Sequence, residues 1–257
     1  MGMKYEQVEI LDQKCIGTDI YDMTIRFESA ARQAKPGQFV DLYSNHEQRL
    51  LPRPISICGF DREKGTIRLV YRAVGEGTRE FSQMKAGDTL RAIGPLGNGY
   101  NIREDKAIVI GGGLGVPPML ALAKELACEK TIVLGYRNEL FLADEFYKIP
   151  ESETLIATED GSVGVKGTVI DALEESRVKG VVIYACGPMP MLRAIAEYAR
   201  EHDMDAQISL EERMACGIGA CLGCVVKTKS LGSHTNVNNQ RVCKDGPVFD
   251  AKEVFFE

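Results

Sequence analysis

Four cysteines near the C-terminus constrain this chain more than any other feature of its sequence. Cys216 and Cys221 are separated by four residues, Cys221 and Cys224 by two, and Cys243 follows after a further eighteen. This C-x4-C-x2-C…C spacing is typical of the loops that hold a [2Fe–2S] cluster through four thiolates in plant-type ferredoxins. The spacing therefore predicts an iron–sulfur cluster in the last fifth of the chain.

The residues between these cysteines suit a tight loop. Gly217, Gly219 and Gly223 would permit positive φ angles, and Ala220 adds little bulk. A structural zinc is the first alternative, although zinc sites usually show two short C-x2-4-C pairs and Cys243 has no close partner in the sequence. Unreactive buried thiols are a second alternative. Disulfides are disfavoured, because nothing in the sequence indicates an oxidising compartment.

The composition limits the partners of the chain. Its 257 residues are 44% hydrophobic and 26% charged, which is ordinary for a globular protein of two domains with or without a small appendage. A net charge of −6 argues against a nucleic-acid or anionic-membrane surface. The charge-free run 107–123 is rich in glycine and proline and is shorter than the roughly 20 residues of a membrane span. Residues 1–6 show no apolar signal region, so we expect a cytoplasmic protein.

Residues 5 to about 100 show the pattern of a small antiparallel barrel. Met23, Ile25 and Phe27 alternate with polar residues, as in a half-buried strand. Further short strands are predicted at residues 38–43, 65–72 and 89–93, and turns containing glycine separate them.

The pattern changes near residue 106. Strands are predicted at residues 107–110, 131–135, 154–158, 180–185 and 206–210, and helices at 116–128, 139–147, 168–175 and 188–202. Apolar strands without alternation that interleave with helices indicate a parallel sheet. The sequence thus predicts a barrel domain at residues 1–102, an α/β nucleotide-binding domain at 103–208 and a small cysteine domain at 209–257.

Two turns of the predicted α/β domain could bind a nucleotide. Gly111-Gly-Gly-Leu-Gly115 lies between a strand and a helix, where backbone N–H groups can approach a pyrophosphate. Cys186-Gly187-Pro188 follows a later strand, at the edge of a parallel sheet where ligands bind. Either turn could equally be a simple strand–helix junction.

The barrel contains a constrained cation. In Leu51-Pro-Arg-Pro-Ile-Ser-Ile57, two prolines flank Arg53 and a hydroxyl follows at Ser56. An arginine held in this way suits a phosphate group, and Gly75-Glu-Gly-Thr78 offers a second turn rich in backbone N–H groups. A kinked edge strand and a surface hairpin are the alternative interpretation.

Taken together, these motifs are similar to those of a known group of proteins. A barrel with Arg-Pro-x-Ser and Gly-x-x-Thr, followed by Gly-Gly-Gly-x-Gly and Cys-Gly-Pro, resembles the ferredoxin reductase superfamily. With the cysteine loop added, residues 1–257 resemble the electron-transfer subunits of class 1B dihydroorotate dehydrogenases, which are iron–sulfur flavoproteins. The most specific parts of this resemblance are Arg53-Pro-Ile-Ser56 and the run from Glu211 to Cys221.

The resemblance implies three sets of binding residues. The sequence itself shows no evident catalytic acid or base. The resemblance assigns FAD to Arg53, Pro54, Ile55, Ser56, Val70, Tyr71, Arg72, Gly77 and Thr78. It assigns NAD to Gly111, Gly112, Gly113, Gly115, Cys186, Gly187 and Pro188. It assigns the [2Fe–2S] cluster to Cys216, Cys221, Cys224 and Cys243.

A chain with these three groups would convert between two-electron and one-electron transfer. NAD exchanges two electrons at once, an iron–sulfur cluster exchanges one at a time, and a flavin can do both. The sequence shows no site for oxidising an organic substrate. The resemblance implies an FMN-containing catalytic subunit, with two copies of each chain in the complex. Electrons would pass from dihydroorotate through FMN, the cluster and FAD to NAD+ in pyrimidine biosynthesis. We expect the surface around Leu222 and Gly223 to face that partner.

Two alternatives remain at this point. A ferredoxin:NAD(P) reductase subunit, or a hydrogenase or sulfhydrogenase subunit, would share all three sites and differ in its partner. A zinc-stabilised nucleotide-binding module without a redox role is an alternative from a different class. The choice between NAD and NADP also stays open, because Arg137 could meet a 2′-phosphate or face solvent.

Overall fold

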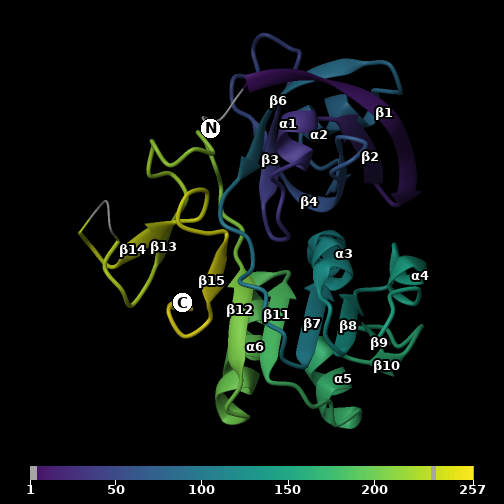
Figure 1. Ribbon diagram of the computed structural model, residues 1–257, viewed down its shortest axis with the longest axis vertical. Coiled ribbons are helices and arrows are strands. Elements are labelled where there is room, and N and C mark those ends of the chain that lie inside the picture. The colour runs from purple at the N-terminus through teal and green to yellow at the C-terminus, as the bar shows by residue number, and fades with distance from the viewer. Residues whose placement is uncertain (1–4, 233–235, 257) are drawn as a thin grey trace.

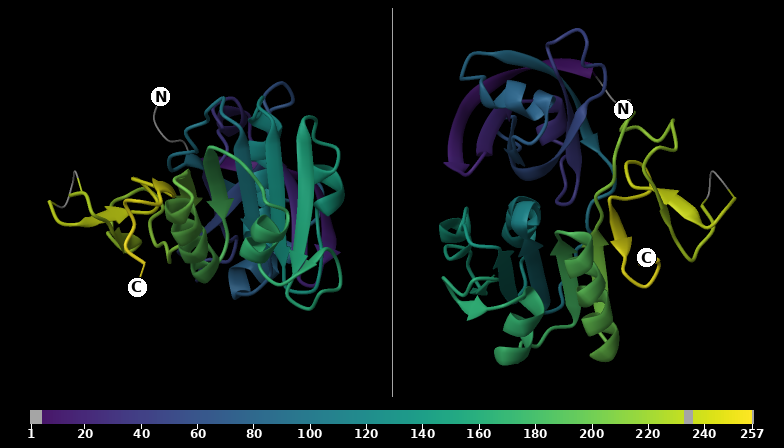
Figure 2. Two further views of the ribbon diagram at one scale, coloured as in Figure 1. Left: turned by 90° about the horizontal axis from the view of Figure 1, so that it is seen from below. Right: turned by 180° about the vertical axis from the view of Figure 1, so that it is seen from behind.

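The structure is a computed structural model that describes residues 5–232 and 236–256. Its N-terminal part is a closed antiparallel barrel, and a sheet of mostly parallel strands lies below the barrel in Figure 1. The C-terminal segment lies beside both parts, as Figure 2 also shows. No helix within the described ranges is long and apolar enough to cross a membrane.

Six strands close the barrel in the order β1-β2-β5-β4-β3-β6. They are β1 (Tyr5–Gly17), β2 (Ile20–Arg26), β3 (Phe39–Tyr43), β4 (Arg53–Asp61), β5 (Thr66–Arg72) and β6 (Thr89–Leu96), with the short helices α1 (Glu28–Ala31) and α2 (Glu76–Ser82) between them. Strand β2 shows the predicted alternation, because Met23 and Ile25 are buried in the barrel core whereas Arg26 is exposed. The antiparallel barrel expected from the sequence is confirmed.

The second sheet has the strand order β10-β9-β8-β7-β11-β12-β15. Its strands are β7 (Ala107–Gly112), β8 (Lys130–Tyr136), β9 (Ser152–Thr158), β10 (Val165–Lys166), β11 (Val182–Cys186), β12 (Asp205–Ser209) and β15 (Val248–Asp250). All pairs are parallel except β12 with β15. Every residue of the central strand β7 is buried, which explains the absence of alternation in its sequence.

The helices of this part follow its strands. They are the 3-10 turn η1 (Gly113–Gly115), α3 (Val116–Glu125), α4 (Ala143–Phe146), α5 (Val169–Glu175) and α6 (Met189–Glu201). Helix α3 has Pro117 and Pro118 in its first turn. The N–H groups of a first turn have no partner within the helix, so proline costs no helical hydrogen bond there. Helix α5 is capped by Thr168, whose hydroxyl accepts a hydrogen bond from the backbone N–H of Asp171.

The helix predicted at residues 139–147 is wrong in length. Only Ala143–Phe146 is helical, and Leu142 before it has a left-handed backbone with φ of 62°. The cause is tertiary: the Tyr136 hydroxyl donates a hydrogen bond of 2.8 Å to the Phe141 carbonyl, and the Phe141 ring packs edge-on against Tyr136. These contacts hold the segment before α4 in an irregular path.

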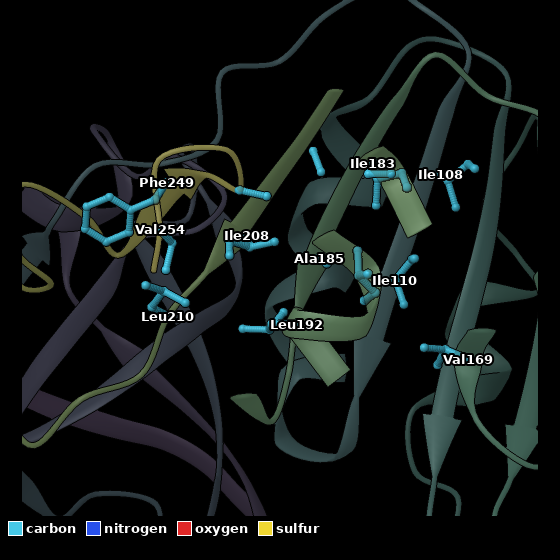
Figure 3. Packing of buried hydrophobic residues seen from close by; sticks show 14 of the residues in the cluster. Ile108, Ile110, Val169, Ile183, Ala185, Leu192, Ile208, Leu210, Phe249 and Val254 are labelled. Carbon is cyan, nitrogen blue, oxygen red and sulfur yellow. The ribbon is translucent and has the colours of Figure 1, made fainter. Parts of the chain in front are cut away.

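The cysteine region shares a core with the parallel sheet. Its strands β13 (Val225–Lys227) and β14 (Asn239–Arg241) pair with each other, while β15 extends the larger sheet. Figure 3 shows Phe249 and Val254 beside Ile208 and Leu210, all in one buried apolar cluster. The buried thiols of this region belong to the same cluster, so the region is anchored to the nucleotide sheet by apolar packing.

An ion-pair network joins the barrel to helix α4. Arg68 on β5 donates to both carboxylate oxygens of Asp22 at 2.9 and 2.7 Å, and to both oxygens of Glu145 at 2.9 and 2.7 Å. The Asp22 hydrogen bonds raise the pKa of Arg68, and the Arg68 hydrogen bonds lower that of Glu145. Because Asp22 is only 4% exposed, loss of the guanidinium would leave a buried carboxylate without its main partner.

We expect Arg68→Met to lower the free energy of unfolding by about 3 kcal/mol, the usual penalty for removing one member of a buried pair. Arg32→Met is the matched control, because the pair of Arg32 with Glu28 is exposed and its loss is expected to cost less than about 0.5 kcal/mol. Urea unfolding of both variants measures the difference. Equal midpoints for the two variants would contradict this account of the network.

Candidate functional site

Strand β4 and helix α2 bring the predicted flavin residues together. Gly77 lies close to Arg53: an added Cβ would be 2.6 Å from Nε of Arg53, so a side chain at this position would force the guanidinium to move. The Arg53 guanidinium donates from Nη1 to the carbonyls of Leu51 at 2.7 Å and Pro52 at 3.2 Å, and no carboxylate of the described ranges pairs with it. Its positive charge is therefore available to an anionic group at the start of α2.

The hydroxyl of Thr78 shapes this turn. It accepts a hydrogen bond from the backbone N–H of Gly75 and donates one to the Gly75 carbonyl, both at 3.1 Å. Ser56 is half-buried. It lies two residues after Pro54 on β4, so the two side chains are on the same face of the strand. Arg53 of β4 and the turn Gly75–Thr78 at the start of α2 thus lie together, and we call these two segments the flavin cradle.

The predicted flavin residues of β5 are oriented differently from one another. The Tyr71 side chain is 2% exposed, packs in the barrel core and donates a hydrogen bond of 2.9 Å from its hydroxyl to Gln13. Val70 faces the core that the barrel shares with the nucleotide sheet, and Arg72 is exposed. A ligand on the outer side of the barrel would meet only the backbone of Tyr71.

The two predicted nucleotide turns touch each other. Strands β7 and β11 are neighbours, with Gly111 paired to Cys186. An added Cβ at Gly115 would lie 2.1 Å from the Cys186 carbonyl, and one at Gly187 would lie 3.2 Å from the backbone nitrogen of Gly112. Gly113 has φ of 53°, and Pro188 caps helix α6. Both turns lie at the carboxyl edge of the parallel strands, where open α/β sheets bind nucleotides.

Two further residues of this region have distinct environments. Cys186 is 1% exposed, and burial raises the pKa of its thiol far above the usual value, so it is a neutral thiol at the sheet edge. Arg137 is exposed and lies 3.8 Å from the Glu159 carboxylate. This ion pair is long and solvated, so it does not hold the Arg137 side chain in one place.

The four cysteines of the C-terminal region form two pairs. The Cys216 and Cys221 side chains hydrogen-bond with each other, as do those of Cys224 and Cys243. Backbone N–H groups also point at sulfur, from Ala220 to Cys216 at 3.3 Å and from Cys243 to Cys224 at 3.4 Å. No three Cys, His, Asp or Glu side chains in residues 5–232 and 236–256 are arranged as a ready metal site.

The loop changes the acidity of these thiols in opposite directions. Burial raises the pKa of Cys216, but hydrogen bonds from the loop backbone, Ile218 first, outweigh it and lower the pKa to about 6. Burial and the neighbouring Cys224 raise the pKa of Cys243 to about 12. A loop of N–H groups directed at a thiolate favours negatively charged sulfur, the form in which cysteine binds metal.

One expectation about the loop backbone is wrong. Gly217 and Gly219 have positive φ angles of 64° and 86°, as predicted, but Gly223 does not. Leu222 adopts the left-handed conformation instead, with φ of 58°, and its side chain is 44% exposed. Because this conformation is uncommon for a bulky residue, the cysteine spacing imposes local strain at the tip of the loop.

Arg241 holds the cysteine loop from the C-terminal side. Its Nη1 donates to the Gly219 carbonyl at 2.8 Å, and its Nε and Nη2 donate to the Asp245 carboxylate at 3.0 and 3.1 Å. Sequence reasoning did not find Arg241, and its only signal was its position two residues before Cys243.

Strand β3 places the cysteine loop beside the flavin cradle. Asp41 pairs in register with Pro54 of β4, and an added Cβ at Gly217 would lie only 1.7 Å from Asp41 Oδ2. Burial raises the pKa of Asp41 to about 7, with a smaller contribution from the charge of Cys216. Sequence reasoning missed Asp41 too, although a carboxylate among the apolar residues of Phe39–Tyr43 is a recognisable signal.

Comparisons with known proteins match both ends of the chain. A model described as an oxidoreductase FAD-binding domain matches residues 7–100, and one described as the iron–sulfur cluster binding domain of dihydroorotate dehydrogenase B matches residues 211–255. A relative from Caldanaerobacter subterraneus subsp. tengcongensis, named dihydroorotate dehydrogenase B (NAD(+)), electron transfer subunit, is 42% identical over 97% of this chain and 98% of its own length. A relative of the same name from Fusobacterium nucleatum is 40% identical over 99% of this chain and 100% of its own length. The chain belongs to the electron-transfer subunits of dihydroorotate dehydrogenase B.

Solved structures agree with this family at the level of fold. A structure described as NADH-dependent reduced ferredoxin–NADP oxidoreductase superposes with a TM-score of 0.86 at 33% identity, over 96% of this chain and 89% of the other. A cytochrome P450 reductase from Amycolatopsis has a TM-score of 0.65 at 21% identity over 79% of this chain and 68% of the other, and shows the shared fold alone.

Membership of this family confirms the expected oxidoreductase subunit, with an FAD-binding barrel, a parallel-rich sheet and a C-terminal iron–sulfur region. The residues fit these groups: Arg53, which forms no ion pair within the described ranges, offers a cation to a dinucleotide phosphate, and the paired thiols offer sulfur ligands. The assignment of individual residues to FAD, NAD and the cluster stays a prediction.

We expect Gly77→Ala to weaken FAD binding by tenfold or more, the effect of losing about one charge-assisted hydrogen bond. The new methyl group would displace Arg53 from the start of α2. Gly59→Ala is the control, because Gly59 lies on β4 with Arg53 and its added Cβ would meet only the Arg68 side chain, at 3.7 Å. Flavin retained per chain after gel filtration measures the effect, and equal retention by the two variants would contradict the assigned role of Arg53.

Proposed function

We propose that this chain passes electrons from an FMN-containing catalytic subunit through a [2Fe–2S] cluster and FAD to NAD+. The catalytic subunit would oxidise dihydroorotate in pyrimidine biosynthesis, and this chain would reduce NAD+. The observation that carries this proposal is the direct contact of the cysteine loop with strand β3, which pairs with the flavin strand β4. Electron transfer requires its cofactors to be close, and this contact brings the two predicted cofactor sites together. The family name of the curated relatives supports the same reaction.

Each set of residues has a defined task in this proposal. Arg53 and the backbone at the start of α2 bind the FAD phosphates, and Ser56 orients the flavin beside β4. The turns at Gly111–Gly115 and Cys186–Pro188 hold NAD at the carboxyl edge of the sheet, which faces the barrel in Figure 1. When bound, the flavin supplies the exchange between one-electron and two-electron chemistry.

The arrangement of the thiols favours a [2Fe–2S] cluster over zinc. Two pairs, Cys216 with Cys221 and Cys224 with Cys243, suit a cluster in which each of two irons takes two thiolates. A single zinc ion would need all four sulfurs at one centre. All eight cysteines lie in the described ranges, and none of them forms a disulfide.

The catalytic partner is expected at the tip of the cysteine loop. Ile218 and Leu222 are 40% and 44% exposed on this loop, and Cys221 beside them is also exposed. A small apolar surface next to a cluster ligand suits a partner that must receive or supply electrons at short distance. We propose that two copies of this chain bind two copies of the FMN-containing subunit through this surface.

The visible spectrum of the complex tests the proposed function. Anaerobically purified together with the FMN-containing subunit, the protein should be brown, and its flavin and cluster bands should bleach with dihydroorotate and regain colour with NAD+. Iron and acid-labile sulfide should each approach two per chain. A colourless chain that contains zinc would refute the redox proposal.

A second candidate function comes from one structural comparison. The neighbour at 33% identity is described as a reduced ferredoxin–NADP oxidoreductase that takes part in electron bifurcation. This chain could therefore serve a ferredoxin-dependent reductase in place of dihydroorotate oxidation. Bleaching by reduced ferredoxin but not by dihydroorotate, with the partner subunit present, would favour this second candidate.

We expect Leu222→Asp to weaken the complex with the catalytic subunit by at least tenfold, because a carboxylate would have to be desolvated at the interface. Val181→Asp is the control: Val181 is 48% exposed but precedes β11, at the edge of the sheet opposite the nucleotide turns. Co-purification of both variants, after their visible spectra show equal cluster content, measures the effect. Unchanged co-purification of Leu222→Asp would remove the loop tip from the interface.

A further inference from the structure

A linker of residues 97–106 joins strand β6 of the barrel to strand β7 of the parallel sheet. The backbone N–H of Asn98 donates a hydrogen bond of 2.7 Å to the Gly246 carbonyl in the C-terminal region. The backbone of Asn101 exchanges two hydrogen bonds of 2.8 Å with the side chain of Gln207 on β12. Figure 1 shows the linker running from the barrel to the start of β7. It is therefore fixed between the C-terminal region and the parallel sheet.

Tyr100 lies in the middle of this linker, where the three parts of the molecule meet. Its backbone N–H donates a hydrogen bond of 3.0 Å to the Pro36 carbonyl, shortly before barrel strand β3. An added Cβ at Gly37 would lie 2.8 Å from Cδ2 of the Tyr100 ring and 2.8 Å from Cγ2 of Val248 on β15. The Tyr100 side chain is 6% exposed and packs in the apolar cluster of the nucleotide sheet. Its ring therefore fills the junction between the barrel, the C-terminal region and the sheet.

The hydroxyl of Tyr100 reaches the carboxyl end of strand β11. It donates a hydrogen bond of 2.9 Å to the Ala185 carbonyl, one residue before Cys186. Burial raises the pKa of Tyr100 well above its usual value, so the hydroxyl keeps its proton and remains a donor. Because the ring packs among apolar side chains, a phenylalanine would fill the same space, and only the bond to β11 would be lost.

Ala185 leads directly into the turn that is predicted to bind NAD. An added Cβ at Gly115 would lie 2.1 Å from the Cys186 carbonyl and 2.6 Å from the backbone nitrogen of Gly187, so the two nucleotide turns are in close contact. Closely packed groups transmit a displacement to their neighbours, so a shift at the end of β11 would also move the glycine turn. The hydrogen bond from Tyr100 thus fixes both turns relative to the barrel, on which the flavin cradle lies.

We propose that Tyr100 is a positioning residue for hydride exchange between NAD and the flavin, because its hydroxyl holds the end of β11 in a fixed place relative to the barrel. This inference rests on the proposed function, because it requires NAD at the two turns. When NADH is the donor, it gives one hydride to the flavin and becomes NAD+, so the flavin gains two electrons. The reacting atoms must approach to about 3.5 Å, and a displacement of the turns therefore slows the transfer.

The test compares two half-reactions of the complex with the catalytic subunit, followed anaerobically by stopped-flow absorbance of the flavin. NADH reduces the flavin from the nucleotide turns, whereas dihydroorotate reduces it from the catalytic subunit through the cluster. We expect Tyr100→Phe to slow reduction by saturating NADH about tenfold and to leave reduction by dihydroorotate unchanged. Tyr184→Phe is the matched control and should keep the NADH rate, because the buried Tyr184 hydroxyl accepts a hydrogen bond of 2.9 Å from the Arg103 N–H in the same linker. Its loss leaves the bond from Tyr100 to Ala185 in place.

An unchanged NADH rate in Tyr100→Phe would overturn the proposal, as would equal slowing of both half-reactions or an equal loss of the NADH rate in Tyr184→Phe. Both rates are measured per bound flavin, so a loss of folded protein cannot imitate the expected result. A Tyr100→Phe chain that retains no flavin would also overturn the proposal, because the hydroxyl would then be needed for folding and not for hydride exchange. Failure of the proposed function is seen separately, because dihydroorotate would then not reduce the flavin of the unaltered complex.

Discussion

The packing of the C-terminal region on the outer face of strand β3 is the contact on which the redox arrangement depends. A barrel strand normally presents its outer face to water, but here Phe39 joins the apolar core that contains two of the four thiols. The same region adds β15 to the parallel sheet, so it touches both other parts of the molecule. The position of the cysteine loop is therefore set by apolar burial, with polar groups adjusting the local geometry.

The barrel and the sheet are joined by interactions of a different kind. Arg68 of β5 makes one bidentate contact with Asp22 of β2 and a second one with Glu145 of α4, and helix α3 packs against β4. Charge-assisted hydrogen bonds are directional, whereas apolar packing tolerates small shifts. The flavin cradle and the nucleotide turns are thus held in a defined relative orientation, while the thiol loop is attached by a less directional contact.

Three locally unfavourable features lie in the thiol loop or next to it. Leu222 has an uncommon positive φ, Asp41 is buried without a partner, and the thiol of Cys243 is hard to ionise. Leu142 before α4 also has a positive φ, so such backbone conformations are not confined to the thiol loop. Departures from local preference that gather at one place mark the functional part of a fold.

Much of the fold could be predicted because short-range physics decides it. Alternation at Met23 and Ile25 indicated a half-buried barrel strand, and the apolar run of β7 indicated a buried parallel one. The cysteine spacing indicated the cluster region without any knowledge of the rest. The residues 139–142 were predicted as helix and are not, because the bond from Tyr136 to Phe141 depends on the packed sheet.

The sequence by itself determined which chemical groups this protein carries: four thiols at a cluster spacing, a constrained arginine, and two glycine turns after buried strands. Only the tertiary structure decided which of them meet. The neighbours of Asp41 are Pro54 and Gly217, the second of them far away along the chain, and no periodic pattern encodes a contact over such a separation. Local patterns arise from a few dihedral angles and the burial of one face, whereas contacts between domains arise from the shape and charge of surfaces that exist only after folding.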